Sequence, residues 1–244
     1  DKDKLDYFAK KYKGIIDDIE QRLRSSPGIQ EVEKTLKPKR KGDIPKFNFA
    51  SPDQLRQLLF GVLKLSSVNT TDKTKKPSTD QQTLEVLAKH NEMANLLLEF
   101  RKYSTLYNTF IVGIQNKIVG GRIHTSYYIP GTVTGRISSS GPNLQNVPEE
   151  IRIIFIPDEG YSFIQVDYKQ AEFRMWAFYS QDPVMIEDIK SGRDIHRIVA
   201  ATIYGIPEEQ ITKDQRKSAK AVVFGVIYGM GIVTLMEEMN CSED

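Results

Sequence analysis

A single carboxylate, Asp167, follows a short and mostly apolar run, YSFIQV (161–166). The run has the composition of a buried strand, so a carboxylate at its exit is held rigidly and meets solvent on one side. Magnesium prefers oxygen ligands of this kind and takes few of them from protein. The sequence therefore predicts a divalent-cation ligand at Asp167. An alternative stays open, in which Asp167 caps the helix that the following residues predict.

A second set of reactive side chains recurs at every fourth position within residues 213–230. The segment has a helical pattern, and a spacing of four places cations and then aromatic rings along one side of a helix. Cations bind a triphosphate, and rings stack on a base. Gly225 and Gly229 are costly inside a helix, which indicates close approach by another backbone or a base. The alternative is an amphipathic helix with its cations over a valine core, Val222, Val223 and Val226. The stripe consists of Arg216, Lys220, Phe224 and Tyr228.

A polar loop over residues 131–148 is rich in Gly, Ser, Thr, Asn and Pro. Four of its side chains suit hydrogen bonding to acceptors in the minor groove of a nucleic acid. The alternative is turn chemistry, because long loops need these same residue types. The four side chains belong to Arg136, Asn143, Gln145 and Asn146.

Composition bounds the class of protein. The 244 residues are 39% hydrophobic and 27% charged, which is typical of a soluble globular protein. The single cysteine, Cys241, excludes an internal disulfide framework and a cysteine-rich zinc site. The charged first residues and the lack of any apolar run near ~20 residues predict a cytoplasmic protein without a signal peptide or membrane span.

The net charge of +2 is too balanced to indicate a nucleic-acid partner by itself. Two basic runs, within 34–46 and 64–76, have the charge to clamp a phosphate backbone. Taken alone, however, they favour solvated charge on exposed loops.

The elements that must position these side chains follow from periodicity and capping. Apolar spacing predicts a helix over 3–24, and Ser51-Pro52-Asp53-Gln54 predicts a second helix start with a capping box. Ser78 to Gln81 repeats that pattern and opens a long helical stretch with a break near His90. Segments 121–129 and 161–167 read as strands, and the pattern is helical after Gln170. Helices, then strands, then helices predict an α+β fold.

Several segments, in this order, resemble the signatures of family A DNA polymerases. The three main ones are TVTGRISSSGPNLQNVP (132–148), DYKQAEFRMWA (167–177) and RKSAKAVVFGVIYG (216–229). GRDIHRIVA (192–200) matches a fourth, and FNFASPDQL (47–55), PSTD (77–80) and LLLEFRKYSTL (96–106) resemble the family's thumb region. The resemblance covers most of residues 45–232.

This resemblance implies an incomplete right-hand polymerase fold, mostly helical with a partial antiparallel palm sheet. It assigns residues 1–100 mostly to the thumb, with a basic tip near 64–76, and residues 101–175 to part of the palm. Residues 176–244 would begin the fingers, including a nucleotide-binding helix at about 213–229.

By the same resemblance, Asp167 and the backbone carbonyl of Tyr168 bind catalytic Mg²⁺ in a two-ion site, and Lys220 is the proton donor to pyrophosphate. His196, Arg216 and Lys220 hold the triphosphate, and Phe224 stacks by the incoming sugar and base. Glu172, packed near Tyr228, fills the space that a ribose 2′-hydroxyl needs. Gln170 and Tyr228 complete the nucleotide-binding set, and the DNA-binding set is Arg101, Arg136, Asn143, Gln145 and Gly229.

The sequence also departs from the family pattern. Val223 stands where asparagine is usual, Thr105 where a basic residue is common, and Lys169 where serine is commoner. The family's His-Asp-Glu sequence, which supplies a second metal-binding aspartate, is absent, and Glu237 and Glu238 are poor substitutes by placement.

We therefore expect the N-terminal part of a DNA polymerase acting in DNA replication or repair. Its partners would be primer–template DNA, dNTPs and a complementary segment or polypeptide that carries the second aspartate. One alternative is a non-catalytic module that binds DNA or nucleotide. A single-subunit RNA polymerase is a further alternative, which Glu172 and the Gly135-Arg136 loop disfavour.

Overall fold

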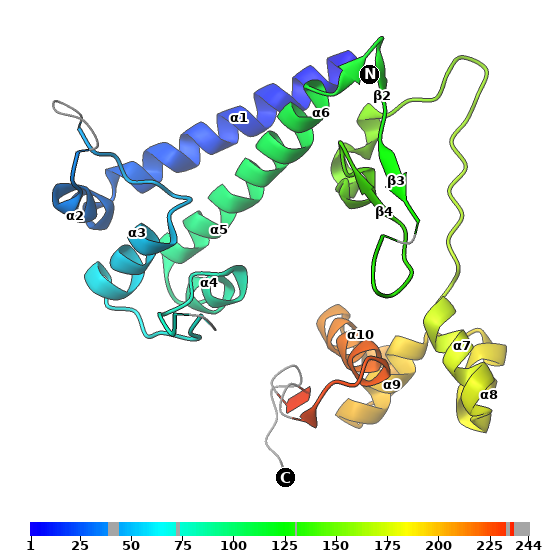
Figure 1. Cartoon of the computed structure of the whole chain (residues 1–244). Coiled ribbons are helices and arrows are strands. Elements are labelled where there is room, and N and C mark those ends of the chain that lie inside the picture. The colour runs from blue at the N-terminus through cyan, green and yellow to red at the C-terminus, as the bar shows by residue number, and fades with distance from the viewer. Residues whose placement is uncertain (39–43, 72–73, 130, 233–234, 237–244) are drawn as a thin grey trace. The chain divides into compact units, whose positions relative to one another are not determined.

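The computed structural model describes residues 1–38, 44–71, 74–129, 131–232 and 235–236 and divides into two compact units (Figure 1). The first unit spans Asp1–Phe163 and the second Ile164–Asp244. The chain is mostly helical with small antiparallel sheets, so the predicted α+β class is confirmed. Among the described residues, no helix combines the length and the apolar character that crossing a membrane requires.

Long helices form the frame of the first unit. α1 and α5 pack against each other along their length, and α4 packs on α5 (Figure 1). Two π-helical segments, Gln57–Val62 and Leu106–Val112, continue α3 and α5. The α-helices are α1 (Lys2–Ser25), α2 (Pro27–Thr35), α3 (Pro52–Arg56), α4 (Gln81–Ala88), α5 (Glu92–Thr105) and α6 (Gly113–Gln115).

The predicted helix starts are close, but two capping details differ. Ser51 caps α3 by accepting from the Gln54 backbone N–H, as expected. The Gln54 side chain instead accepts from the Asn48 backbone N–H at 2.6 Å, so the reciprocal half of the capping box is wrong. The cap of α4 is Asp80 rather than Ser78, because the Ser78 hydroxyl accepts from the Asp80 N–H and leaves the Asp80 carboxylate for the Thr83 N–H. The predicted break near His90 is present between α4 and α5.

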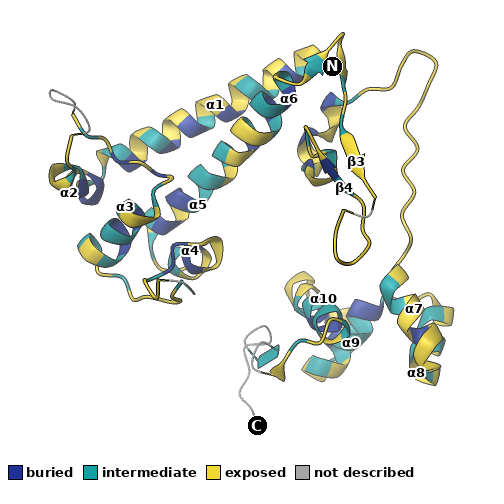
Figure 2. Ribbon diagram, viewed as in Figure 1, coloured by how far each residue is buried: buried dark blue, intermediate teal, exposed yellow. Residues whose placement is uncertain are grey.

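Two apolar clusters hold this unit together (Figure 2). The larger one gathers α2, α3, α4 and the adjoining parts of α1 and α5. It includes the rings of Phe47, Phe49 and Phe100, which contact one another at tilted angles. The smaller one joins the start of α1 to the segment after α5 and includes the fully buried Tyr12. Burial together with Glu150 raises the pKa of the Tyr12 hydroxyl to about 12.

The sheets of the first unit are short. β1 (Ile118–Val119) pairs with β2 (Arg122–Ile123), and β3 (Ser126–Tyr128) pairs with β4 (Ser138–Ser140), both antiparallel. The predicted strand 121–129 is therefore two strands, interrupted where the Thr125 hydroxyl donates to the Ser140 and Pro142 carbonyls. The long polar loop contains β4 and continues into the 3₁₀ turns Leu144–Asn146 and Glu149–Ile154.

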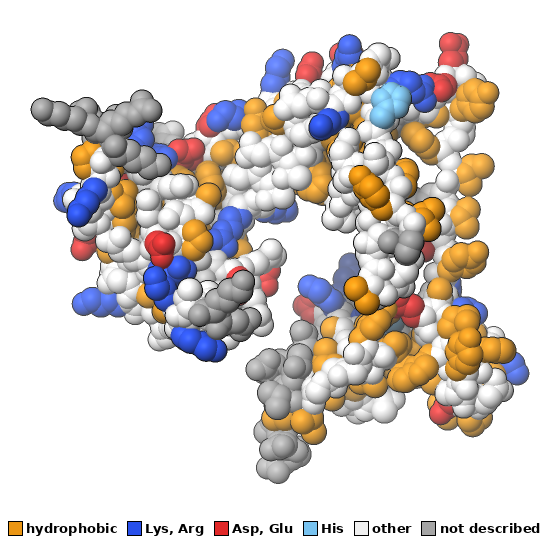
Figure 3. All heavy atoms as spheres, in the orientation of Figure 1, with side chains coloured by type: hydrophobic (Ala, Val, Ile, Leu, Met, Phe, Trp, Pro, Cys, Tyr) orange, Lys and Arg blue, Asp and Glu red, His pale blue; other side chains and the backbone are white. Residues whose placement is uncertain are grey.

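The second unit is two helix pairs. α7 (Ala171–Ser180) contacts α8 (Pro183–Ser191), and α9 (Ile195–Tyr204) packs on α10 (Lys213–Ile227). A 3₁₀ turn, Glu208–Gln210, links the second pair, whose small core is Ala200, Ile211 and Ala219. Large apolar side chains stay exposed over α7 and α8 (Figure 3), among them Met175, Phe178, Tyr179 and Val184.

The predicted strand at 161–167 is wrong. These residues form no strand, and Ile164 and Val166 are 87% and 83% exposed. A strand is held by hydrogen bonds to a neighbouring strand. None of the described segments pairs with this one, so its apolar side chains do not reach a core.

We expect Asp80→Ala to lower the free energy of unfolding by about 1 kcal/mol, because the α4 cap is lost. The Thr83 backbone N–H lowers the pKa of the Asp80 carboxyl. The stabilisation is therefore complete above the unfolded-state pKa of about 3.9 and is lost as pH falls through the lower folded value. Urea unfolding at pH 7 and pH 3 measures both effects, with Asp53→Ala as the control for an exposed aspartate. Equal losses at both pH values would contradict the role of the ionised cap.

Candidate functional site

The α9–α10 pair brings four of the predicted nucleotide-binding side chains together. Thr212 and Gln215 form a capping box that starts α10, which sets the register of the stripe. The Lys220 ammonium lies 5.9 Å from the centroid of the Phe224 ring. The His196 ring, from α9, lies 5.8 Å from the same ring at an interplanar angle of 44°. Arg216 precedes Lys220 by about one turn of α10, and both cations interact electrostatically with the His196 imidazole.

The alternative offered for α10, an amphipathic helix, is also present. Val222 and Val223 are buried, whereas Val226 is 47% exposed. The buried valines face the neighbouring structure while Lys220 stays exposed. Core packing and an exposed cationic side chain therefore coexist on one helix.

The His196 side chain is 5% exposed, and its Nδ1 has no hydrogen-bond partner among the described residues. Burial lowers the pKa of this imidazole, and the cations of Arg216 and Lys220 lower it further, against the opposing effect of Asp194. The ring is consequently neutral near pH 7, where one of its two nitrogens donates and the other accepts.

Asp194 is a residue that the sequence analysis missed. Its carboxylate accepts from the backbone N–H groups of His196 and Arg197 and so caps α9. The same carboxylate accepts from Arg216 Nε at 2.7 Å. The signal was available, because an aspartate directly before an apolar helical pattern is a typical cap.

Glu172 and Tyr228 lie together, as the resemblance implied. The Tyr228 hydroxyl donates to Glu172 Oε1 at 2.7 Å, which joins the first turn of α7 to the residue that ends α10. Gln170 precedes α7 in the left-handed region at φ 55°, a conformation that turns the chain sharply into the helix.

Asp167 and Tyr168 are exposed and lie in the extended stretch before α7. The capping alternative for Asp167 is wrong, because the cap position belongs to Gln170 and carries no side-chain cap bond. The backbone just after the pair is fixed instead by Arg174, whose Nε donates to the Lys169 carbonyl at 2.8 Å. The described residues contain no group of three or more His, Cys, Asp or Glu side chains able to hold a metal ion.

Gly225, within α10, and Gly229, just after it, occupy their positions for different reasons. A Cβ on Gly225 would collide with the Met230 side chain, which folds back over the end of the helix. Gly229 has φ +77° and open space around it, so its requirement is the left-handed turn after the helix. For Gly225, the close protein neighbour is a side chain of the same unit rather than another backbone, and approach by a base stays a prediction.

In the first unit, the loop side chains already make turn contacts. Asn143 Oδ1 accepts from the Ser139 hydroxyl and the Gln145 backbone N–H, and Gln145 Nε2 donates to the Ile137 carbonyl at 3.0 Å. These hydrogen bonds stabilise the loop itself, as the turn-chemistry alternative predicted. Asn143, Gln145 and Arg136 are nevertheless exposed, which leaves their ligand roles as predictions.

Arg101 is half-buried and donates from Nη1 to the Thr79 carbonyl at 2.7 Å. Burial lowers the pKa of its guanidinium, and the Asp80 carboxylate opposes that shift. The side chain borders a cavity of about 530 Å³ together with Glu85, Lys102 and Glu150. Its contact with DNA stays a prediction.

The basic runs are only partly within the described residues. Lys34, Lys37 and Lys46 of the first run are exposed, whereas Lys39, Arg40 and Lys41 lie outside the described part. In the second run, Lys64, Lys75 and Lys76 are described and Lys73 is not. Glu237, Glu238 and Cys241 also fall outside it.

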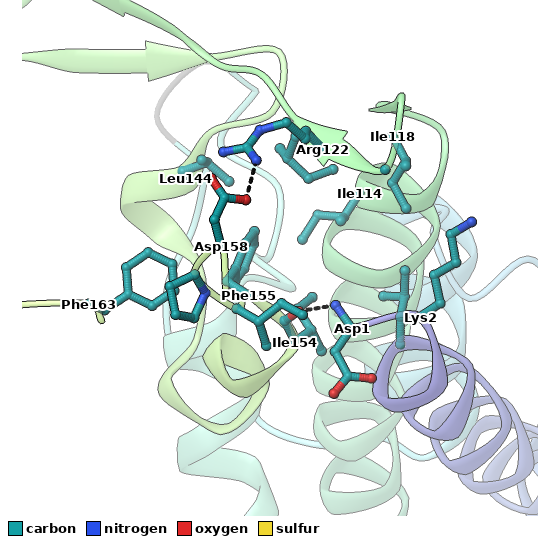
Figure 4. Close-up of a pocket in the computed structure, with 15 residues that line it drawn as sticks. Asp1, Lys2, Ile114, Ile118, Arg122, Leu144, Ile154, Phe155, Asp158 and Phe163 are labelled. Carbon is teal, nitrogen blue, oxygen red and sulfur yellow. Dashed lines mark hydrogen bonds and ion pairs between the residues drawn. The ribbon is translucent and has the colours of Figure 1, made fainter. Parts of the chain in front are cut away.

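A separate cavity of about 420 Å³ in the first unit has a mostly apolar lining (Figure 4). Ile114, Ile118 and Phe155 face it, and the ion pair between Arg122 and Asp158 lies at its side (Figure 4). None of the side chains assigned to chemistry lines this cavity.

Comparisons with known proteins agree with the motifs. A protein-family model described as DNA polymerase family A matches residues 18–244. The chain is 38% identical over 201 residues to "DNA polymerase I, thermostable" of Thermus aquaticus, covering 79% of this chain and 24% of that protein. It is 37% identical over 203 residues to DNA polymerase I of Pseudomonas aeruginosa, covering 80% of this chain and 22% of that protein.

A solved structure is also similar. The POL domain of Pol1 from M. smegmatis, in complex with DNA primer-template and dNTP, superimposes with a TM-score of 0.79 at 28% identity. The match covers 98% of this chain and 41% of that one. The chain thus spans about a quarter of the length of the curated relatives it matches.

Proposed function

We propose, because this chain belongs to DNA polymerase family A, that it contributes the DNA-gripping and nucleotide-gripping parts of a template-directed DNA polymerase. The observation that carries the proposal is the cluster of His196, Arg216, Lys220 and Phe224 on α9 and α10. Clustered cations beside a ring suit a nucleoside triphosphate, whose phosphates and base need both kinds of contact. The similar POL domain of Pol1 was solved with DNA primer-template and dNTP, which supports the same ligands here.

In this proposal, Arg216, Lys220 and His196 hold the triphosphate, and Lys220 protonates the departing pyrophosphate. Phe224 stacks beside the incoming sugar and base. Gln170, Glu172 and Tyr228 complete the nucleotide pocket. The exposed loop residues Arg136, Asn143 and Gln145 meet the minor groove, Arg101 meets the DNA backbone, and Gly229 lies beside the template. Residues 1–100, 101–175 and 176–244 then correspond to most of the thumb, part of the palm and the start of the fingers.

Asp167 fits a Mg²⁺ site only in part. Its exposed carboxylate and the neighbouring Tyr168 carbonyl are oxygen ligands of the right kind, yet the described residues form no group of three or more His, Cys, Asp or Glu side chains around them that could hold a metal ion. Bound Mg²⁺ would supply activation of the primer 3′-hydroxyl and charge neutralisation at the leaving group. We propose that the second carboxylate comes from a segment or polypeptide outside the described residues.

Primer extension tests the function. The chain is combined with a polypeptide that carries the remaining family motifs, a labelled primer–template, Mg²⁺ and one dNTP at a time. We expect addition only of the nucleotide that pairs with the template base. Persistent inactivity of a verified assembly, with DNA binding intact, would favour the alternative of a binding module. Equal incorporation of ribonucleotides would favour the RNA polymerase alternative.

A further inference from the structure

Asp194 connects two elements that carry the proposed triphosphate ligands. Its Oδ1 accepts from the His196 N–H at 3.1 Å and from the Arg197 N–H at 3.4 Å, at the start of α9. Its Oδ2 accepts from Arg216 Nε at 2.7 Å, in the first turns of α10. A single carboxylate therefore bonds to the backbone of His196 and to the side chain of Arg216.

The contact uses only one edge of the Arg216 guanidinium. A guanidinium presents five N–H donors in a planar fork, and the Nε–H is one of them. Within the part of the chain that the structure describes, Arg216 makes no other side-chain hydrogen bond or ion pair. The four Nη–H donors thus stay available in a plane that Asp194 orients, and two parallel N–H donors match the geometry of a phosphate.

A second aspartate–arginine pair among the described residues of this unit is built differently. Arg193 donates to Asp188, Glu208 and the Ser191 hydroxyl. Its guanidinium N–H donors are therefore already bonded to three side chains of this protein. Asp188 accepts from Arg193 and caps no helix. The Asp194–Arg216 pair instead leaves one edge of its guanidinium open beside Lys220 and His196.

We propose that Asp194 is a positioning residue for triphosphate binding, which orients Arg216 and fixes the helix start that carries His196. The inference rests on the proposed function, since it assigns Asp194 to the same nucleotide site. Binding is stronger when the ligand-holding side chain is already ordered, because less conformational entropy is lost on association. A carboxylate near the phosphates also repels them, so the proposal requires the ordering effect to exceed that repulsion.

Asp194→Asn separates the two contacts. Asparagine caps helices about as well as aspartate, so α9 keeps its cap. Its single side-chain oxygen is then committed to the α9 N–H groups, and its amide N–H₂ cannot accept from Arg216 Nε. We expect the affinity of the 244-residue chain for Mg²⁺-dATP to fall about fivefold. This is the change in affinity expected when binding must also order one long side chain. Asp188→Asn removes the same charge from the same unit and is expected to leave the affinity within about twofold.

A double-mutant cycle with Arg216→Ala decides whether Asp194 acts through Arg216. We expect Arg216→Ala alone to weaken binding, and Asp194→Asn to add nothing in the Arg216→Ala background. An equal loss in both backgrounds would mean a merely structural role and would overturn the proposal. A gain in affinity for Asp194→Asn would mean that repulsion prevails, and it would overturn the proposal as well.

Failure of the proposed function has a different signature, because Arg216→Ala and Lys220→Ala would then bind Mg²⁺-dATP as the unsubstituted chain does. The hydrogen bond between Arg216 Nε and Asp194 can also be tested without nucleotide, by measuring hydrogen exchange. In ¹⁵N-arginine-labelled protein, we expect the Arg216 Nε–H to exchange slowly with solvent, and to exchange fast in Asp194→Asn. Fast exchange in the unsubstituted chain would overturn the positioning role regardless of nucleotide binding.

Discussion

Asp167→Ala abolishes templated extension by the reconstituted polymerase, with an expected loss on the order of 10³-fold or more. The carboxylate is exposed at the end of an extended stretch and makes no helix cap, so its removal has little to disturb in the folded chain. The loss therefore falls on the chemical step and is measured as the single-turnover rate of nucleotide addition at saturating dNTP. Primer–template affinity is expected to stay within about twofold.

Two further variants sharpen this prediction. Asp167→Asn keeps the shape and loses the charge, and it should be nearly as inactive as the alanine variant because a neutral amide is a poor Mg²⁺ ligand. Glu159→Gln removes an exposed carboxylate shortly before the same stretch and should extend normally. A fully active Asp167→Asn enzyme would exclude Asp167 as a metal ligand.

Glu172→Ala is expected to reduce the preference for dNTPs over rNTPs by about 10²-fold, which corresponds to ~2.7 kcal/mol. The Tyr228 hydroxyl donates to this carboxylate at 2.7 Å, which restrains its rotation, so we expect the side chain to stay where it would exclude a 2′-hydroxyl. The measurement is kcat/KM for each nucleotide in the active assembly. The gain should appear for ribonucleotides, with kcat/KM for dNTPs changing far less.

Tyr228→Phe is the matched control for that prediction. It deletes the hydroxyl that donates to Glu172 and keeps the ring. If fixation of the carboxylate matters, discrimination should fall by less than in Glu172→Ala, by about tenfold at most. Unchanged discrimination in Glu172→Ala, with extension intact, would exclude Glu172 as the element that rejects the 2′-hydroxyl.

The parts of the fold that sequence reasoning predicted well are those governed by local interactions. α1 and the Ser51 cap follow from spacing and from one side chain bonding to a nearby N–H. The residue that caps α4 was harder to predict, because serine and aspartate both cap helices. In this turn, the Ser78 hydroxyl and the Asp80 carboxylate each accept a hydrogen bond from a backbone N–H. Periodicity likewise predicted the stripe on α10, because helical spacing alone aligns Lys220 with Phe224.

The failures involve partners distant in sequence. The Asp194–Arg216 bond joins residues 22 positions apart on two helices, and nothing in either segment alone predicts it. The strand predicted at 161–167 failed for the same reason, because apolar composition indicates a strand only where another strand is available to pair.

The unpaired stretch from Tyr161 to Tyr168 has a consequence for handling the protein. It presents apolar side chains and backbone hydrogen-bonding groups together along an extended chain, with Phe163 69% and Tyr168 84% exposed. An extended apolar stretch of this kind can pair with the same stretch of another molecule. We therefore expect Ile164→Lys, which places a charge within this stretch, to lower self-association of the 244-residue chain in concentrated solution, as measured by light scattering.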